Sequence, residues 1–156
     1  LDLRESWEGS RFSHATVAKR LLDMGPVVQV GVRTGSPEEL ETLEKHQMKP
    51  FWGHQIHQMP PSIWIRQVVD QLGPNVYVTL DIDGLDPSIM PATGTPVPGG
   101  LQWYDLLTLL KTVAENCNVV GFDLCEFAPI PGLVGPNFTA ALLLYKMIGY
   151  FVPLNL

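Results

Sequence analysis

Carboxylates end the apolar segment at 76–80, and this pattern of a strand followed by acids is the strongest constraint in the sequence. Asp81 and Asp83 follow the segment two residues apart. In extended chain, side chains at this spacing point to the same face, with Cα atoms roughly 6 to 7 Å apart. Like charges at the end of a buried strand are costly without a compensating cation, so both are predicted to bind a common pair of metal ions. The alternative is a simple turn, which Asp favours.

The two aspartates belong to a compound pattern that runs along the chain. The sequence Asp-Ile-Asp-Gly-Leu-Asp-Pro occupies 81–87, and Pro-Ala-Thr-Gly-Thr-Pro and a glycine pair follow at 91–96 and 99–100. The other motifs are a second acidic stretch after an apolar segment and short N-terminal elements: Asp123-Leu124-Cys125-Glu126-Phe127-Ala128-Pro129, Asp2-Leu3-Arg4, Gly9-Ser10 and Ser13-His14-Ala15. Together these residues resemble the ureohydrolase family, which includes arginase, agmatinase and guanidinobutyrase, over essentially the whole chain.

The resemblance implies an α/β fold, three-layer α/β/α with a mainly parallel sheet, and a centre of two Mn²⁺ ions. By that resemblance Asp81 bridges both ions, Asp83 binds one and Asp2 binds the other. Carboxylates suit such divalent ions, which lower the pKa of a bridging water and so supply hydroxide. The implied reaction is attack of this hydroxide on the carbon of a guanidino group.

Further residues are implied to act on the substrate. Glu126 resembles the family carboxylate that receives the guanidinium and orients its carbon. His14 matches the histidine that helps move protons to the leaving amine, a role that suits an imidazole at neutral pH. The alternative for His14 is a surface histidine at a helix start. Thr95 is expected to help line the pocket, Asp123 is a further candidate nearby, and Asp86 is predicted to form a turn.

The N-terminal residues bear on both the substrate and the extent of the domain. Leu1-Asp2 resembles the end of the family motif Asp-Ala-His-x-Asp, so residues 1–156 are expected to be the C-terminal portion of one catalytic domain, with the remaining ligands upstream. Arginases tend to place Asn where this chain has Arg4, which makes agmatinase the best match, converting agmatine to putrescine and urea. Guanidinobutyrate, guanidine and arginine are alternative substrates, and an inactive truncated remnant is the non-enzyme alternative.

Composition and charge agree with a globular enzyme of a reducing compartment. Hydrophobic residues make up 46% of the 156 positions and charged residues 17%, as in folded proteins. The net charge of -6 argues against nucleic-acid binding and suits a small cationic guanidino substrate. No segment resembles a signal peptide or a membrane span. Cys117 and Cys125 flank one predicted strand about 26 Å long, too far apart for a disulfide. We expect a cytoplasmic protein without membrane contact and, by the family resemblance, a homo-oligomer, either trimer or hexamer.

Helical and strand patterns alternate, which favours a parallel sheet covered by helices. The candidate site residues after the second and third strands then lie at carboxyl ends, where such sheets place their ligands. A long loop at 84–100 is expected to be functional. His54 and His57 are predicted to be solvated loop residues. Helices are expected at 13–24, 36–47, 62–72, around 103–113 and at 138–151, and strands at 27–32, 76–81 and 119–122.

Overall fold

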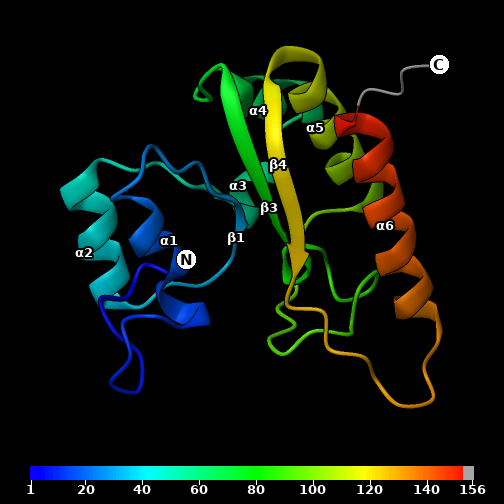
Figure 1. Ribbon diagram of the computed structural model, residues 1–156, viewed down its shortest axis with the longest axis horizontal. Coiled ribbons are helices and arrows are strands. Elements are labelled where there is room, and N and C mark those ends of the chain that lie inside the picture. The colour runs from blue at the N-terminus through cyan, green and yellow to red at the C-terminus, as the bar shows by residue number, and fades with distance from the viewer. Residues whose placement is uncertain (153–156) are drawn as a thin grey trace.

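The computed structural model describes residues 1–152, in which helices and short strands alternate (Figure 1). The elements in chain order are η1 (His14–Thr16), α1 (Val17–Leu21), β1 (Val30–Val32), α2 (Pro37–His46), β2 (Phe51–Trp52), α3 (Gly53–Ile56), α4 (Pro61–Val69), β3 (Asn75–Asp81), η2 (Ile82–Gly84), α5 (Trp103–Asn116), β4 (Asn118–Cys125) and α6 (Gly135–Phe151). Among these described helices, none combines the length and apolar character needed to cross a membrane.

All strand pairs in the described residues are parallel. β3 pairs with β4 in a register that runs from Asn75 opposite Asn118 to Asp81 opposite Cys125. β1 pairs with β2 in a separate two-stranded sheet. In Figure 1, α1 and α2 lie on one side of the strands, and α5 and α6 lie on the other. The predicted α/β architecture with parallel strands between helices is confirmed, and the carboxyl ends of β3 and β4 meet at one edge.

The main core lies between the β3–β4 sheet and the helices that follow it in the chain. Five apolar residues at helical spacing on α5 were expected in the core: Leu106, Leu107, Leu110 and Val113 are buried, whereas Trp103 is only partly buried. They pack in one cluster with Trp64 of α4 and with residues of α6. Removal of this apolar surface from water, at about 25 cal/mol per Å², is the main force that holds the strands against the helices.

Helix α6 buries only one of its apolar faces in the described structure. Leu143 and Met147 are completely buried, and Ala140 and Phe151 are nearly so. On the other faces, the side chains of Phe138 and Tyr145 are 71% and 70% exposed.

The boundaries of several elements differ from the sequence-based expectations. The helix predicted at 13–24 begins as a 3₁₀ turn and ends at Leu21, after which Met24 and Gly25 both donate to the Leu21 carbonyl. The strand predicted at 27–32 is regular only over Val30–Val32. β4 is longer than expected and reaches Cys125. The predicted start of α2 is confirmed, with Pro at the first turn and a capping box between Ser36 and Glu39.

The segment between Pro50 and Pro60, which carries His54 and His57, was expected to be a loop, and this prediction is wrong for residues 51–56. Phe51 N donates to Gln29 O at 2.8 Å and opens β2, which pairs with β1. The short helix α3 follows directly. Both elements are too short for hydrophobic periodicity to reveal them, because periodicity needs a window of roughly 11 residues or more.

Candidate functional site

The site begins where β3 ends, at Asp81. The chain does not continue in extended form, because residues Ile82–Gly84 turn into η2. The backbone N–H of Asp83 folds back and donates to Asp81 Oδ1 at 3.0 Å. The expectation of two carboxylates on one face of an extended strand is therefore wrong in its geometry. A tight turn, rather than the pleat, brings Asp83 beside Asp81.

The charges of three other acidic residues act on Asp81. Burial raises the pKa of Asp81 to about 7, and the negative charge of Asp83 adds to the effect. The Asp83 N–H opposes this rise, whereas the charges of Glu126 and Asp2 increase it further. The structure thus brings Asp2, Asp83 and Glu126 within electrostatic reach of Asp81.

Asp2 is the candidate ligand whose pKa responds to His14. Burial raises the pKa of Asp2, as do the charges of Glu39 and Asp83, while His14 acts in the opposite direction. His14 is the first residue of η1, and its ring lies 6.4 Å from the ring of Trp7, centroid to centroid. The predicted histidine is therefore within electrostatic reach of Asp2.

The backbone is unusual at two of the predicted site residues. Asp2 has φ 54° and Glu126 has φ 60°, both in the left-handed region that residues other than glycine rarely adopt. Such conformations persist only where surrounding contacts hold them, and they cluster at functional sites. At Asp2 these contacts are identified: its carbonyl accepts from Lys19 N at 3.1 Å, and the next N–H, of buried Leu3, donates to Glu39 Oε1 at 3.1 Å. Glu126 follows directly after the end of β4.

Thr95 contacts the candidate site through Asp83. Its hydroxyl donates to Asp83 Oδ2 at 2.8 Å, so the structure assigns it a partner that the sequence-based interpretation had not named. Asp123 lies within β4, not at its end, and its carboxylate accepts from Tyr77 and Thr79 hydroxyls at 2.9 and 2.8 Å. Its hydrogen-bond partners are thus on β3, before the residues of the candidate site.

The long loop at 84–100 is closed onto the end of β3 by polar contacts. Asp86 forms the predicted turn by accepting from Ser88, and its Oδ2 accepts from Gly99 N at 2.8 Å. Hydrogen bonds from Ser88, and also from Gly99, lower the pKa of Asp86 to about 2. Gly100 lies so close to Leu85 that a Cβ there would meet the Leu85 carbonyl carbon at 2.4 Å.

His57 adds a contact that the sequence-based interpretation missed. The residue is exposed, as expected, but its Nε2 lies 3.2 Å from Gly99 O and 3.1 Å from Gly100 O. Because both partners are carbonyls, Nε2 carries the proton and donates. No local signal could reveal this role, since the partners are more than 40 positions away in the sequence. His54 is exposed at the start of α3.

The donor chemistry of the cluster fits a hard divalent cation, but only as part of a ligand set. Carboxylate oxygens are the ligands that Mg²⁺ and Mn²⁺ prefer, and a bound cation would offset the mutual repulsion around Asp81. In the described range 1–152, however, no group of three or more His, Cys, Asp or Glu side chains is placed to hold a metal ion. Asp2, Asp81 and Asp83 are therefore candidates for a share of the coordination.

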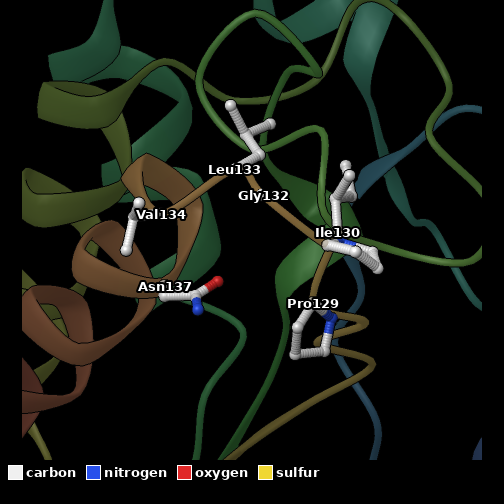
Figure 2. A pocket seen from close by; sticks show the side chains of 7 residues that line it. Pro129, Ile130, Gly132, Leu133, Val134 and Asn137 are labelled. Atoms are coloured by element: carbon white, nitrogen blue, oxygen red, sulfur yellow. The ribbon is translucent and has the colours of Figure 1, made fainter.

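A hollow of about 250 Å³ lies in the loop between Glu126 and α6. Figure 2 shows that it is framed by side chains of the loop itself and by the first turn of the helix. Its lining is mostly apolar and includes none of the predicted site residues: Pro129, Ile130, Pro131, Gly132, Leu133, Val134 and Asn137. The candidate chemistry therefore lies outside this hollow.

Comparison with known sequences identifies the family of the chain. A sequence model described as the Arginase family matches residues 1–149. An N(1)-aminopropylagmatine ureohydrolase of Thermus thermophilus is 41% identical over 149 residues, covering 95% of this chain and 50% of the relative. An agmatinase of Pyrococcus horikoshii is 36% identical over 151 residues, covering 96% and 52%. The chain thus spans about half the length of the curated relatives it matches.

Comparison of folds gives the same result. The crystal structure of agmatine ureohydrolase of Thermoplasma volcanium superimposes with a TM-score of 0.85 at 31% sequence identity. The match covers 96% of this chain and 51% of that one. The arrangement of the described elements is therefore that of half a ureohydrolase subunit.

Proposed function

The chain belongs to the arginase family, and we propose that it is the C-terminal part of an enzyme that hydrolyses a guanidino compound to urea and an amine. The observation that carries this proposal is the position of Asp81 and Asp83 at the carboxyl end of β3, beside the end of β4 that Glu126 follows, where Asp2 and Glu126 both raise the pKa of Asp81. The family match supports the class of reaction, and the electrostatics of the cluster support the place where it occurs.

We assign the three aspartates to the binding of metal. Asp81 and Asp83 would hold it from the end of β3 and the turn that follows. Asp2, whose backbone is left-handed, would hold it from the N-terminal segment. When bound, a pair of divalent ions, here proposed as Mn²⁺, makes a shared water acidic enough to act as a nucleophile at neutral pH. The remaining ligands are expected from the part of the longer protein outside these residues.

Glu126 and His14 are assigned to the substrate. A carboxylate that accepts from a guanidinium forms charge-assisted hydrogen bonds, which fix the planar group in one orientation. Glu126 lies close enough to affect the pKa of Asp81, so a guanidinium on Glu126 would lie beside the ligands. Breaking the C–N bond of the substrate requires a proton on the departing amine. His14, whose charge acts on Asp2, is proposed to deliver it.

The substrate is proposed to be a guanidino amine rather than arginine. At the position where arginases tend to carry Asn, the Arg4 guanidinium lies 4.3 Å above the ring of Trp7, and its Nε lies 4.0 Å from Glu39 Oε2. The amide that arginases tend to place here is thus replaced by a guanidinium held by Trp7 and Glu39, so we do not expect the contact that reads the amino-acid head of arginine. Agmatine is the first candidate, with putrescine and urea as products. N(1)-aminopropylagmatine is the second, because a relative 41% identical carries that activity in its name.

The test is urea release by the longer protein that contains residues 1–156, supplied with Mn²⁺. The panel of substrates is agmatine, N(1)-aminopropylagmatine, guanidinobutyrate, guanidine and arginine. We expect one of the first two to give the highest kcat/KM, and Asp81→Ala to lose bound metal and activity by orders of magnitude. Urea release from none of these substrates would favour the inactive remnant, and full activity in Asp81→Ala would refute the proposed site.

We further propose that the whole protein is a homo-oligomer. The exposed Phe138 and Tyr145 side chains on α6 support this, because large apolar surface is usually covered by a partner. Light scattering of the purified longer protein gives the subunit number, with a trimer or hexamer as the expected result and a monomer as the contrary one.

A further inference from the structure

Arg33 lies at the carboxyl end of the short strand β1, and its side chain reaches the turn that follows β3. The side chain is only 11% exposed. Its Nη1 donates to Gly31 O at 2.6 Å and its Nε donates to Val97 O at 3.2 Å. Its Nη2 donates to the backbone carbonyl of Asp83. One guanidinium therefore connects β1, the turn that carries Asp83, and the long loop at 84–100.

The same guanidinium faces the carboxylate of Asp83. Arg33 Nη2 lies 3.7 Å from Asp83 Oδ1, while the other carboxylate oxygen accepts from the Thr95 hydroxyl at 2.8 Å. The Asp83 N–H is bound to Asp81 Oδ1. Asp83 is thus fixed through its N–H and carbonyl, and its carboxylate is flanked by a partner at each oxygen.

Hydrogen bonds that only hold the loops together could be made by a neutral side chain at position 33. Burial of a charged group carries a desolvation cost that neutral donors avoid. The planar guanidinium offsets this cost by presenting its donors in a rigid fork, which the single ammonium of a lysine cannot reproduce. The charge also has a partner at this place, because Arg33 Nη2 lies 3.7 Å from Asp83 Oδ1.

We propose that Arg33 is a positioning residue for the metal centre, which acts by orienting the carboxylate of Asp83 together with Thr95. The inference rests on the proposed function, because it takes Asp83 to be a metal ligand. Groups that orient a ligand by hydrogen bonding typically change metal affinity or activity by about 10- to 100-fold when they are replaced. Arg33 is absent from the motifs that identify the family in this sequence.

The experiment uses the longer protein and compares Arg33→Met and Arg33→Lys with wild type. Titration with Mn²⁺, followed by electron paramagnetic resonance of the free ion, gives the metal affinity, and urea release gives kcat and KM separately. We expect Arg33→Met to weaken Mn²⁺ binding and to lower kcat, each by about tenfold or more, while KM changes little because Arg33 does not contact the substrate. Arg33→Lys is expected to lie between Arg33→Met and wild type.

The matched control is Arg66→Met, which breaks the exposed Arg66–Asp70 ion pair on α4 (2.8 Å). It is expected to leave Mn²⁺ affinity and kcat unchanged. Thermal unfolding of each variant reports folding. A lowered unfolding midpoint with wild-type Mn²⁺ affinity and kcat in the folded protein would mean a purely structural role and would overturn the inference. If Arg33→Met does not fold, Arg33→Lys decides, and wild-type affinity and kcat in that variant would overturn it too.

The proposed function and this inference fail in different ways. If wild type releases no urea, or Asp81→Ala keeps full activity, the proposed function is wrong and the inference falls with it. If wild type is active, Asp81→Ala is inactive and the Arg33 variants match wild type, only the inference is wrong.

Discussion

At the scale of single residues, Glu126 offers the sharpest separation of substrate binding from metal binding. Glu126→Gln keeps the shape of the side chain but removes the charge that would pair with a guanidinium. We expect the longer protein with this change to retain its bound Mn²⁺ and to lose kcat/KM. The lost transition-state stabilisation should be roughly 1.5 to 3 kcal/mol, the value of a hydrogen bond to a charged group. Metal analysis and urea release measure the two effects. Loss of metal, or normal catalysis, would contradict the assigned role.

The positions of the candidate residues at the ends of strands were predictable from the sequence, their local geometry was not, and their roles stay predictions. The acidic motifs correctly indicated Asp81, Asp83 and Glu126 at the carboxyl ends of strands. The prediction that Asp83 continues the extended strand was wrong, because its backbone N–H donates to Asp81 Oδ1 and turns the chain out of the strand. Arg33 and His57 were missed because their partners are distant in sequence, and no local pattern encodes such contacts.

At the scale of elements, the buried carboxylate of Glu39 links helix α2 to Asp2. Its Oε2 accepts from Ser36 N at 2.8 Å and its Oε1 accepts from Leu3 N at 3.1 Å. Burial alone raises the pKa of Glu39, but the hydrogen bonds from Ser36 and Leu3 outweigh it and hold the pKa below its ordinary 4.5. One side chain thus both caps the helix and fixes the peptide that follows Asp2.

Glu39→Gln is expected to destabilise the protein, because an amide has one accepting oxygen where the carboxylate has two. One backbone N–H is then left unsatisfied, at a cost of about 1 to 3 kcal/mol. The stabilisation by the carboxylate is present above about pH 4.5 and is lost as pH falls through the lower folded pKa. Urea unfolding of the longer protein at pH 7 and near pH 3 measures both effects. Glu41→Gln, on an exposed position of the same helix, is the control. An unchanged unfolding midpoint at pH 7 would contradict the prediction.

A second prediction at this scale concerns Gly100 in the long loop. A Cβ at Gly100 would lie 2.4 Å from the Leu85 carbonyl carbon and 2.5 Å from Asp86 N. Gly100→Ala must therefore displace backbone, and we expect a loss of about 1 to 3 kcal/mol of stability. Gly149→Ala is the matched control, because a Cβ there meets nothing within 4 Å and alanine in a helix is favoured by roughly 0.5 to 1 kcal/mol. Thermal or denaturant unfolding compares the two, and equal stability of both variants would show that the loop yields freely.

Long elements were predictable and short ones were not. Helix α5 was predicted from the helical spacing of its apolar residues, and α2 from its capping box. Both signals depend only on residues close in the sequence. β2 forms because β1 supplies a pairing partner for Phe51, and α3 follows it directly. A local sequence pattern contains no information about this pairing. The parallel pairing of β3 with β4 followed from the alternation of helices and strands, since a helix such as α5 is the usual crossover between parallel strands.

At the scale of the whole molecule, the described residues leave apolar surface uncovered. Within the described chain β3 and β4 pair only with each other. On these strands Tyr77 is 59% exposed and Val120 is 63% exposed. Free strand edges and apolar patches of this kind promote association between chains. The relatives, which are about twice as long, have further chain to cover such surface.

We therefore expect residues 1–156 made alone to release no urea from any guanidino compound and to aggregate, whereas the longer protein is active and oligomeric. The chemical reason is that the three aspartates hold at most part of the coordination, and carboxylates alone do not fix two ions at the separation of about 3.5 to 4 Å that a shared water requires. Size-exclusion chromatography with light scattering and a urea assay with Mn²⁺ test both halves of the prediction. A soluble, monomeric and manganese-dependent activity from these residues alone would show that they complete a centre by themselves. His54 and His57 would then be the first side chains to replace, since His57 contacts the long loop and His54 lies in the short helix that precedes it.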